Sequence, residues 1–164
     1  MAAFKKLFIL CFVIYSIIIF ISFIGLLIGI LLAKISPEEL KPGKIYFILL
    51  EKLILMAVII VIFFNSKISL FGLFIGALIG YFFRKEYFYF GLVLVISSQS
   101  EFNLFLMYLI FIYGLPYGTL LKKEIIKKIN INLIFFLLPL FFLINNLYLN
   151  YNNLLYSFII SALI

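Results

Sequence analysis

Long apolar runs separated by short polar islands constrain the fold of this chain more than any other feature of the sequence. The first run covers residues 7–33 and the second covers residues 45–64. A helix of about 20 apolar residues spans the hydrocarbon core of a membrane, whereas a membrane β-barrel would alternate polar and apolar residues. The runs show no such alternation, so we predict an all-α, polytopic helical membrane protein.

Composition agrees with this prediction, because 68% of the residues are hydrophobic and the mean hydropathy is +1.36. Soluble domains are only about half apolar. No island is long enough to fold alone, so residues 1–164 are predicted to form a single integral membrane domain. We expect a bundle of about six transmembrane helices, in a range of about five to seven, with one candidate re-entrant element. The expected segments are 7–33, 45–64, 68–83, 87–98, 102–121 and 133–149. The last apolar segment, at 154–164, is too short to span the membrane alone. We expect it to dip into the membrane, lie on its surface or pair with 133–149.

The chain lacks the residues that most membrane enzymes use. It has no His and no Asp, and Cys11 is its only cysteine. Ser–His hydrolases, His-bound metal sites and aspartate-based enzymes all require residues that are absent here. The sequence therefore favours a protein that is not an enzyme and that has no cofactor or metal centre.

The net charge of +7 is spread over short loops. Nucleic-acid binding requires a contiguous basic face, so we expect no nucleic-acid partner and take the lipid bilayer as the expected partner. Basic residues in short loops mark the cytoplasmic side of a membrane protein. We predict that the basic loops at residues 34–44, 84–86 and 122–132 are cytoplasmic.

One of the two islands without a basic residue lies at residues 97–103, between two apolar flanks. If the chain crosses the membrane once here, the polar side chains lie inside the membrane as candidate ligands for an ion, a proton or a substrate. If the chain reverses, they form the solvated tip of a hairpin. The candidate site residues under either interpretation are Ser97, Gln99, Ser100, Glu101 and Asn103.

The distribution of basic residues favours the hairpin. With a hairpin, the three basic loops share one side and carry nine Lys and Arg residues, whereas Lys5, Lys6 and Lys67 lie on the other side. A single central span would divide the basic loops almost evenly. The positive-inside rule therefore favours a hairpin with the N-terminus outside, although Lys5 and Lys6 alone would favour the opposite orientation.

Two apolar runs carry small residues at every fourth position. Such ridges let helices approach closely, so that van der Waals contact drives their association in a membrane. We expect them to pack inside the chain or to form the seam of a homo-oligomer, and a translocation groove is the alternative. The ridges consist of Gly25, Gly29 and Ala33 in the first run, and of Gly72, Gly76 and Gly80 in the third.

Glu51 and Lys52 lie about two turns into the second run. Neighbouring residues do not share a helix face, so the two side chains are not expected to pair with each other. Lys52 is expected to extend towards the membrane interface. The partner of Glu51 stays open between a basic residue of another loop and the face that carries Glu101.

These features favour a non-catalytic subunit or assembly component of a membrane complex, with a membrane protein partner or a second copy of the chain. Short loops, two small-residue ridges and the lack of an extramembrane domain are typical of a chain that packs against other proteins. The alternative is a small transporter or channel that uses the polar residues around Glu101. Polar groups at discontinuous helices form such sites, and Pro139 and an expected helix break at residues 114–118 would provide flexibility.

Overall fold

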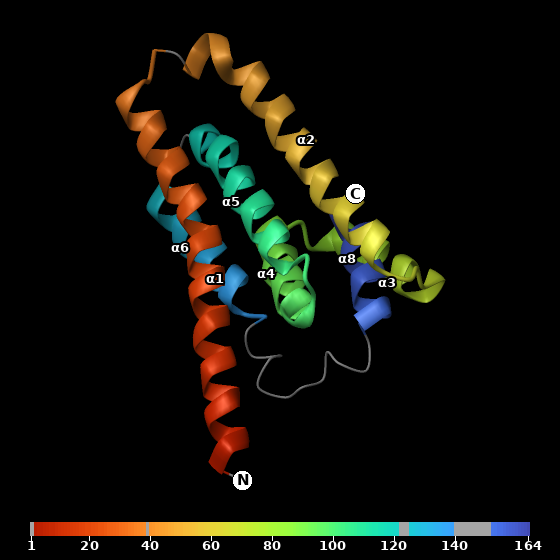
Figure 1. Ribbon diagram of the computed structural model, residues 1–164. Coiled ribbons are helices and arrows are strands. Elements are labelled where there is room, and N and C mark those ends of the chain that lie inside the picture. Colours follow the sequence, from red (N-terminus) through yellow and green to blue (C-terminus); the bar gives the residue numbers. More distant parts are fainter. Residues whose placement is uncertain (1, 39, 122–124, 140–151) are drawn as a thin grey trace.

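The computed structural model describes residues 2–38, 40–121, 125–139 and 152–164, which contain seven α-helices, one short 3₁₀ turn and no strand. The prediction of an all-α fold is confirmed for this part of the chain. The elements are α1 (Ala2–Ile35), α2 (Leu40–Asn65), α3 (Leu70–Phe82), α4 (Glu86–Ile96), η1 (Ser97–Gln99), α5 (Asn103–Leu120), α6 (Ile125–Leu137) and α8 (Asn152–Leu163) (Figure 1).

Two helices in the described part are long and apolar enough to cross a membrane. They are Pro42–Asn65, which is most of α2, and Asn103–Leu120, which is α5. Helices α3, α4 and α8 are apolar but shorter. These lengths are compatible with a membrane protein, and the predicted number of spans stays a prediction.

Helices α1 and α5 lie side by side and run parallel (Figure 1). A Cβ atom on Gly25 would overlap the carbonyl oxygen of Phe111, and one on Gly29 would overlap that of Leu115. Gly114 of α5 faces the α1 backbone in the same way. The first ridge therefore packs against another helix of the same chain, and its third member, Ala33, is only half-buried.

Helices α3 and α8 form a second parallel pair. Gly72, Gly76 and Gly80 are buried, and a Cβ atom on any of them would overlap main-chain atoms of α8. The start of this contact is also polar, because the Ser69 main-chain N–H donates to the Ser157 hydroxyl at 2.7 Å. The last apolar segment of the sequence thus packs on α3, while most of its expected partner, residues 140–149, lies outside the described residues.

Proline positions account for three differences from the predicted segments. The expected break at residues 114–118 is wrong, because α5 continues through Pro116 to Leu120. Helix α2 begins at Leu40 instead of residue 45, and Pro42 lies in its first turn, where its missing N–H has no intrahelical role. Pro139 follows the end of α6 at Leu137, so it ends that helix instead of bending it.

The predicted loop at residues 122–132 is partly wrong, because α6 begins at Ile125. Lys127 and Lys128 are exposed on this helix, whereas Asn132 is buried. A helix can therefore contain this polar segment, since its charged residues face outwards while one polar side chain faces the core.

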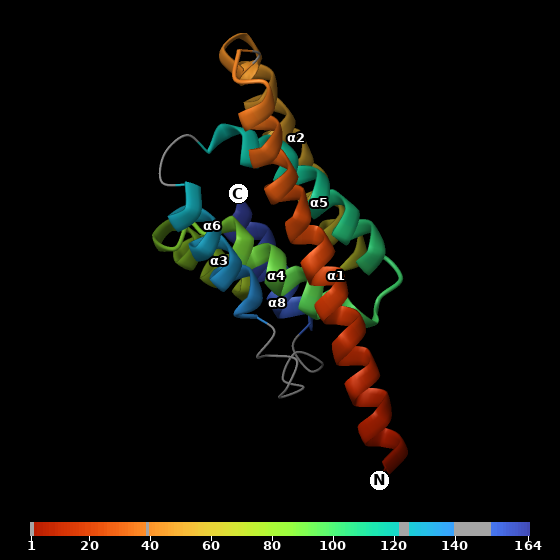
Figure 2. The ribbon, with the colours of Figure 1, turned by 90° about the vertical axis from the view of Figure 1, so that its left-hand side faces the viewer.

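Helix α4 lies at the centre of the fold and contacts α6 and α8 (Figure 2). Every residue from Tyr89 to Ile96 is buried, so this helix is apolar on all sides. Gly91 allows the main chain of α6 to approach it at Phe136. The core is thus formed by a short helix that other helices surround.

We expect Gly29→Ala to lower the free energy of unfolding by about 1–3 kcal/mol, as overpacking does in other proteins. The reason is that the new methyl group would meet main-chain atoms of α5, which cannot move aside independently. Thermal unfolding of the purified protein in detergent measures the change.

Gly43→Ala is the matched control within α2. Its Cβ atom would first meet a ring carbon of Phe47 at 3.2 Å, and that ring can turn aside. Alanine stabilises a helix relative to glycine by about 1 kcal/mol, so this variant should be at least as stable as the wild type. A Gly29→Ala protein that unfolds at or above the wild-type temperature would contradict the close approach of α1 and α5.

Candidate functional site

The polar segment at residues 97–103 forms a turn in which the chain reverses direction. The 3₁₀ turn η1 follows α4 directly, and α5 begins at Asn103. At the other end of the same two helices, the Tyr113 hydroxyl contacts the carboxyl group of Glu86. Helices α4 and α5 are therefore antiparallel arms of a hairpin whose tip is this segment.

Most polar groups of the hairpin tip bond to one another. The Ser97 hydroxyl donates to Asn103 Oδ1 at 2.9 Å, and both residues are buried. The Ser100 hydroxyl donates to the Ser97 carbonyl oxygen at 2.5 Å. Glu101 is exposed, and the Gln99 side chain lies outside the described residues. The five candidate residues thus share a turn, but Glu101 does not lie among the buried ones.

A second polar cluster lies between helices that are distant in the sequence. Its centre is the Tyr113 hydroxyl of α5, which lies 3.2 Å from Glu51 Oε1 of α2. The same hydroxyl is in closer contact with Glu86 Oε2, in the first turn of α4. Tyr113 is fully buried, and both glutamates are partly buried. We call Glu51, Glu86 and Tyr113 the acidic cluster.

Aromatic side chains surround the acidic cluster. The ring centroid of Tyr113 lies 4.8 Å from that of Phe90 and 5.7 Å from that of Tyr117. The Asn132 amide of α6 donates to the Tyr117 hydroxyl at 3.4 Å. The Tyr87 hydroxyl is buried and has no hydrogen-bond partner in the described part of the chain. Four helices therefore bring hydroxyl, amide and carboxyl groups to one place.

Neither glutamate of the acidic cluster forms an ion pair with a described Lys or Arg side chain at a distance of 4.0 Å or less. Lys52 influences Glu51 electrostatically, but its side chain is exposed. Two unit charges about 5 Å apart repel each other by about 3 kcal/mol at an effective dielectric constant of about 20. The acidic cluster is thus costly if both carboxyl groups are ionised.

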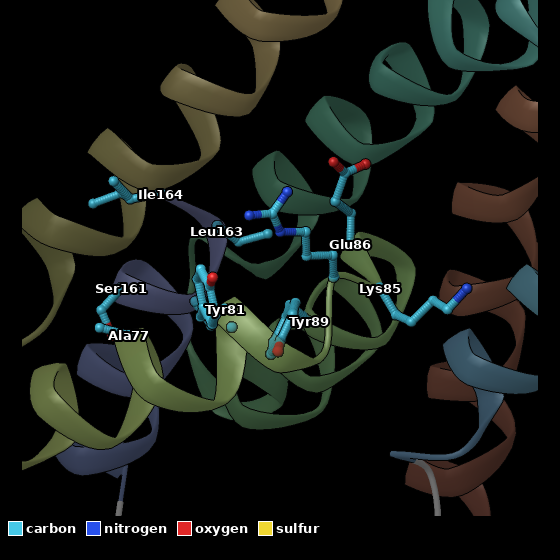
Figure 3. Close-up of a pocket in the computed structure, with 11 residues that line it drawn as sticks. Ala77, Tyr81, Lys85, Glu86, Tyr89, Ser161, Leu163 and Ile164 are labelled. Atoms are coloured by element: carbon cyan, nitrogen blue, oxygen red, sulfur yellow. The ribbon is translucent and has the colours of Figure 1, made fainter.

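An open pocket of about 510 Å³ lies between the end of α3, residues 84–86 and the end of α8 (Figure 3). The guanidinium group of Arg84 lies 5.7 Å from the centroid of the Tyr81 ring. Lys85 and Glu86 extend away from Tyr81 and from each other (Figure 3). Two helix C-termini meet here, and their carbonyl groups carry partial negative charge that offsets the positive charge of Arg84. The lining of this pocket also includes Lys85 and Glu86, so it carries charges of both signs.

The sequence did not predict the acidic cluster. Glu51 lies inside an apolar run, but Glu86 belongs to a predicted basic loop and Tyr113 to the predicted apolar segment at residues 102–121. Their separations of 62 and 27 residues leave no local pattern that joins them. No family model matches this chain, and no curated protein or solved structure shows significant similarity to it.

We expect Glu101→Cys, in a chain that also carries Cys11→Ser, to react readily with a membrane-impermeant maleimide. Glu101 is exposed at the hairpin tip, so the reagent should reach it from one side of the membrane. Asn103→Cys in the same background is the control, because Asn103 is only 5% exposed. That variant should react at a much lower rate until the protein is denatured. Labelling of Glu101→Cys only after denaturation would place the hairpin tip inside the protein or the membrane.

Proposed function

We propose that this chain is a multi-pass membrane protein that serves as a non-catalytic component of a membrane complex. The observation that carries the proposal is an exposed apolar stripe on α2. Its members are spaced three or four residues apart, so they share one face of the helix, and each is at least 50% exposed. The stripe consists of Leu49, Leu53, Met56, Ile60 and Phe64.

Helix α3 carries a similar stripe, whose members are also more than half exposed. Soluble monomers rarely expose contiguous apolar patches of more than a few hundred Å². Two long stripes on neighbouring elements therefore support an apolar environment of lipid and other membrane helices. The members of the α3 stripe are Phe71, Phe74, Leu78 and Phe82.

The positions of the helix ends show which parts of the chain would share one side of a membrane. The end of α1, the start of α2 and the C-terminal end of α5 lie at one end of the molecule (Figures 1 and 2). The 97–102 turn and the N-terminus lie towards the opposite end. In the proposed topology the first end faces the cytoplasm, and the basic segments at residues 34–44, 84–86 and 122–132 lie on the cytoplasmic side.

The glycine ridges bear on how such a component would bind a partner. Both ridges already pack within the chain, against α5 and α8. The surfaces left for another protein include the apolar stripes of α2 and α3, which fit a second apolar helix. A chain with these surfaces is suited to assembly.

A small transporter is the second candidate function, and the acidic cluster is the observation that favours it. Ionisable residues inside membrane proteins commonly mark ion or proton pathways. The residues that support this candidate are Glu51, Glu86 and Tyr113, since Glu101 is exposed at the hairpin tip.

We expect the wild-type chain to resist extraction from membranes by alkaline carbonate, and Met56→Lys to reduce the resistant fraction strongly. A lysine near the centre of a span costs about 3 kcal/mol of insertion free energy. Met56→Leu is the matched control and should behave like the wild type. Release of the wild-type chain by carbonate would contradict the proposed membrane location.

Native mass spectrometry after purification in a mild detergent distinguishes the two candidate functions. A component of a complex should be recovered with a second protein in fixed stoichiometry, and Phe74→Ala should weaken that association if α3 binds the partner. Leu104→Ala, on an exposed apolar position of α5, is the control. Recovery of the chain alone, with a bound small molecule or ion, would favour the transporter instead.

A further inference from the structure

We propose that the acidic cluster is a proton-binding site in which Glu51 and Glu86 share one proton through the Tyr113 hydroxyl. The native pair then carries a single negative charge. A shared proton at this site is compatible with both a structural component and a transporter. The proposed site therefore does not depend on either proposed function.

The first support is the number of protons available for hydrogen bonds. A phenol has one proton, yet the Tyr113 oxygen contacts a carboxyl oxygen of Glu51 at 3.2 Å and one of Glu86 more closely. An ionised carboxylate can accept a hydrogen bond but cannot donate one. If both glutamates were ionised, the single Tyr113 proton could serve only one of the two contacts, and the other contact would join two oxygens with no proton between them. One added proton completes the chain, because a carboxyl O–H then donates to Tyr113 while Tyr113 donates to the other carboxylate.

The second support is independent of the two carboxyl groups. Tyr87 is 2% exposed, and its hydroxyl has no partner within the described residues. The ring centroid of Tyr87 lies 6.2 Å from that of Tyr113 and 5.2 Å from that of Tyr117, so Tyr87 lies beside the acidic cluster. A buried polar group without a partner calls for an unseen ligand or water. A hydroxyl that both donates and accepts suits a place where a proton is bound and exchanged.

Direct contact between the oxygens favours a proton over a metal cation. The Tyr113 hydroxyl occupies the space between the two carboxyl oxygens, so an ion could enter only by separating α2 from α4 and α5.

The other charged and titratable groups around the acidic cluster do not replace the shared proton. Lys52 of α2 is exposed, the Arg84 guanidinium lies 5.7 Å from the centroid of the Tyr81 ring, and Lys85 extends to the Phe135 ring, 5.8 Å from its centroid. The Tyr117 hydroxyl of α5 receives a hydrogen bond from Asn132 of α6. None of these side chains gives a second proton to the contacts of Tyr113 in the described part of the chain.

Infrared spectroscopy of the purified protein at neutral pH tests the shared proton. A protonated carboxyl group has a C=O stretching band that is separate from the carboxylate bands and shifts in D₂O. We expect about one such group per wild-type chain. We expect its complete loss in Glu51→Gln and equally in Glu86→Gln, because the remaining carboxylate can accept the Tyr113 proton alone.

Glu101→Gln is the control and should keep the band, since Glu101 is exposed and distant in sequence from both glutamates. Thermal unfolding checks that each variant is folded, and if one glutamine variant does not fold, the other provides the same test. Absence of the band from the wild type would overturn the proposal. Survival of the band in either glutamine variant would also overturn it, because the remaining carboxyl group would then be protonated without sharing the proton. A wild type without the band whose unfolding temperature rises with Na⁺ but not with choline would assign the site to a cation instead.

Discussion

The close approach of α1 and α5 at their glycines is the contact on which the rest of the arrangement depends. In lipid, apolar side chains gain nothing by meeting one another, so helices associate where small residues allow their backbones to touch. Gly25 and Gly29 of α1 provide that contact, and Gly114 of α5 faces them. The position and rotation of α5 are thereby fixed.

That rotation decides where Tyr113 points. Successive helical residues are turned by about 100° from one another, since a turn contains 3.6 residues. With Gly114 against α1, Tyr113 faces a different side of α5, towards Glu51 of α2 and Glu86 of α4. The close contact of α1 and α5 at their glycines thus places the Tyr113 hydroxyl beside two carboxyl groups. The glycine ridge and the acidic cluster look unrelated in the sequence. In the fold, the position of Tyr113 in the acidic cluster follows from the glycine contact.

Features of the sequence that depend on local spacing predicted the structure well, and features that depend on tertiary contact did not. The apolar runs indicated helices, and the glycine spacing indicated which helix faces pack closely. The segment at residues 122–132 was misread because its lysines suggested a loop, whereas α6 turns Lys127 and Lys128 outwards. The acidic cluster was missed because it joins residues from three helices, and only the fold brings Glu51 and Glu86 to the same phenol.

The shared proton would also affect the contact between α2 and the α4–α5 hairpin. Glu51 belongs to α2, whereas Glu86 and Tyr113 belong to the two arms of the α4–α5 hairpin. With the proton bound, one hydrogen bond joins Glu51 of α2 to Tyr113, and a second joins Tyr113 to Glu86 within the hairpin. Without it, one bond is lost and like charges repel across the same contact, where the low dielectric of an apolar environment strengthens the repulsion. The position of α2 relative to the hairpin is therefore coupled to the occupancy of one proton. Helix α2 also carries the exposed apolar stripe, so the same proton would influence the surface that we propose meets lipid or a partner.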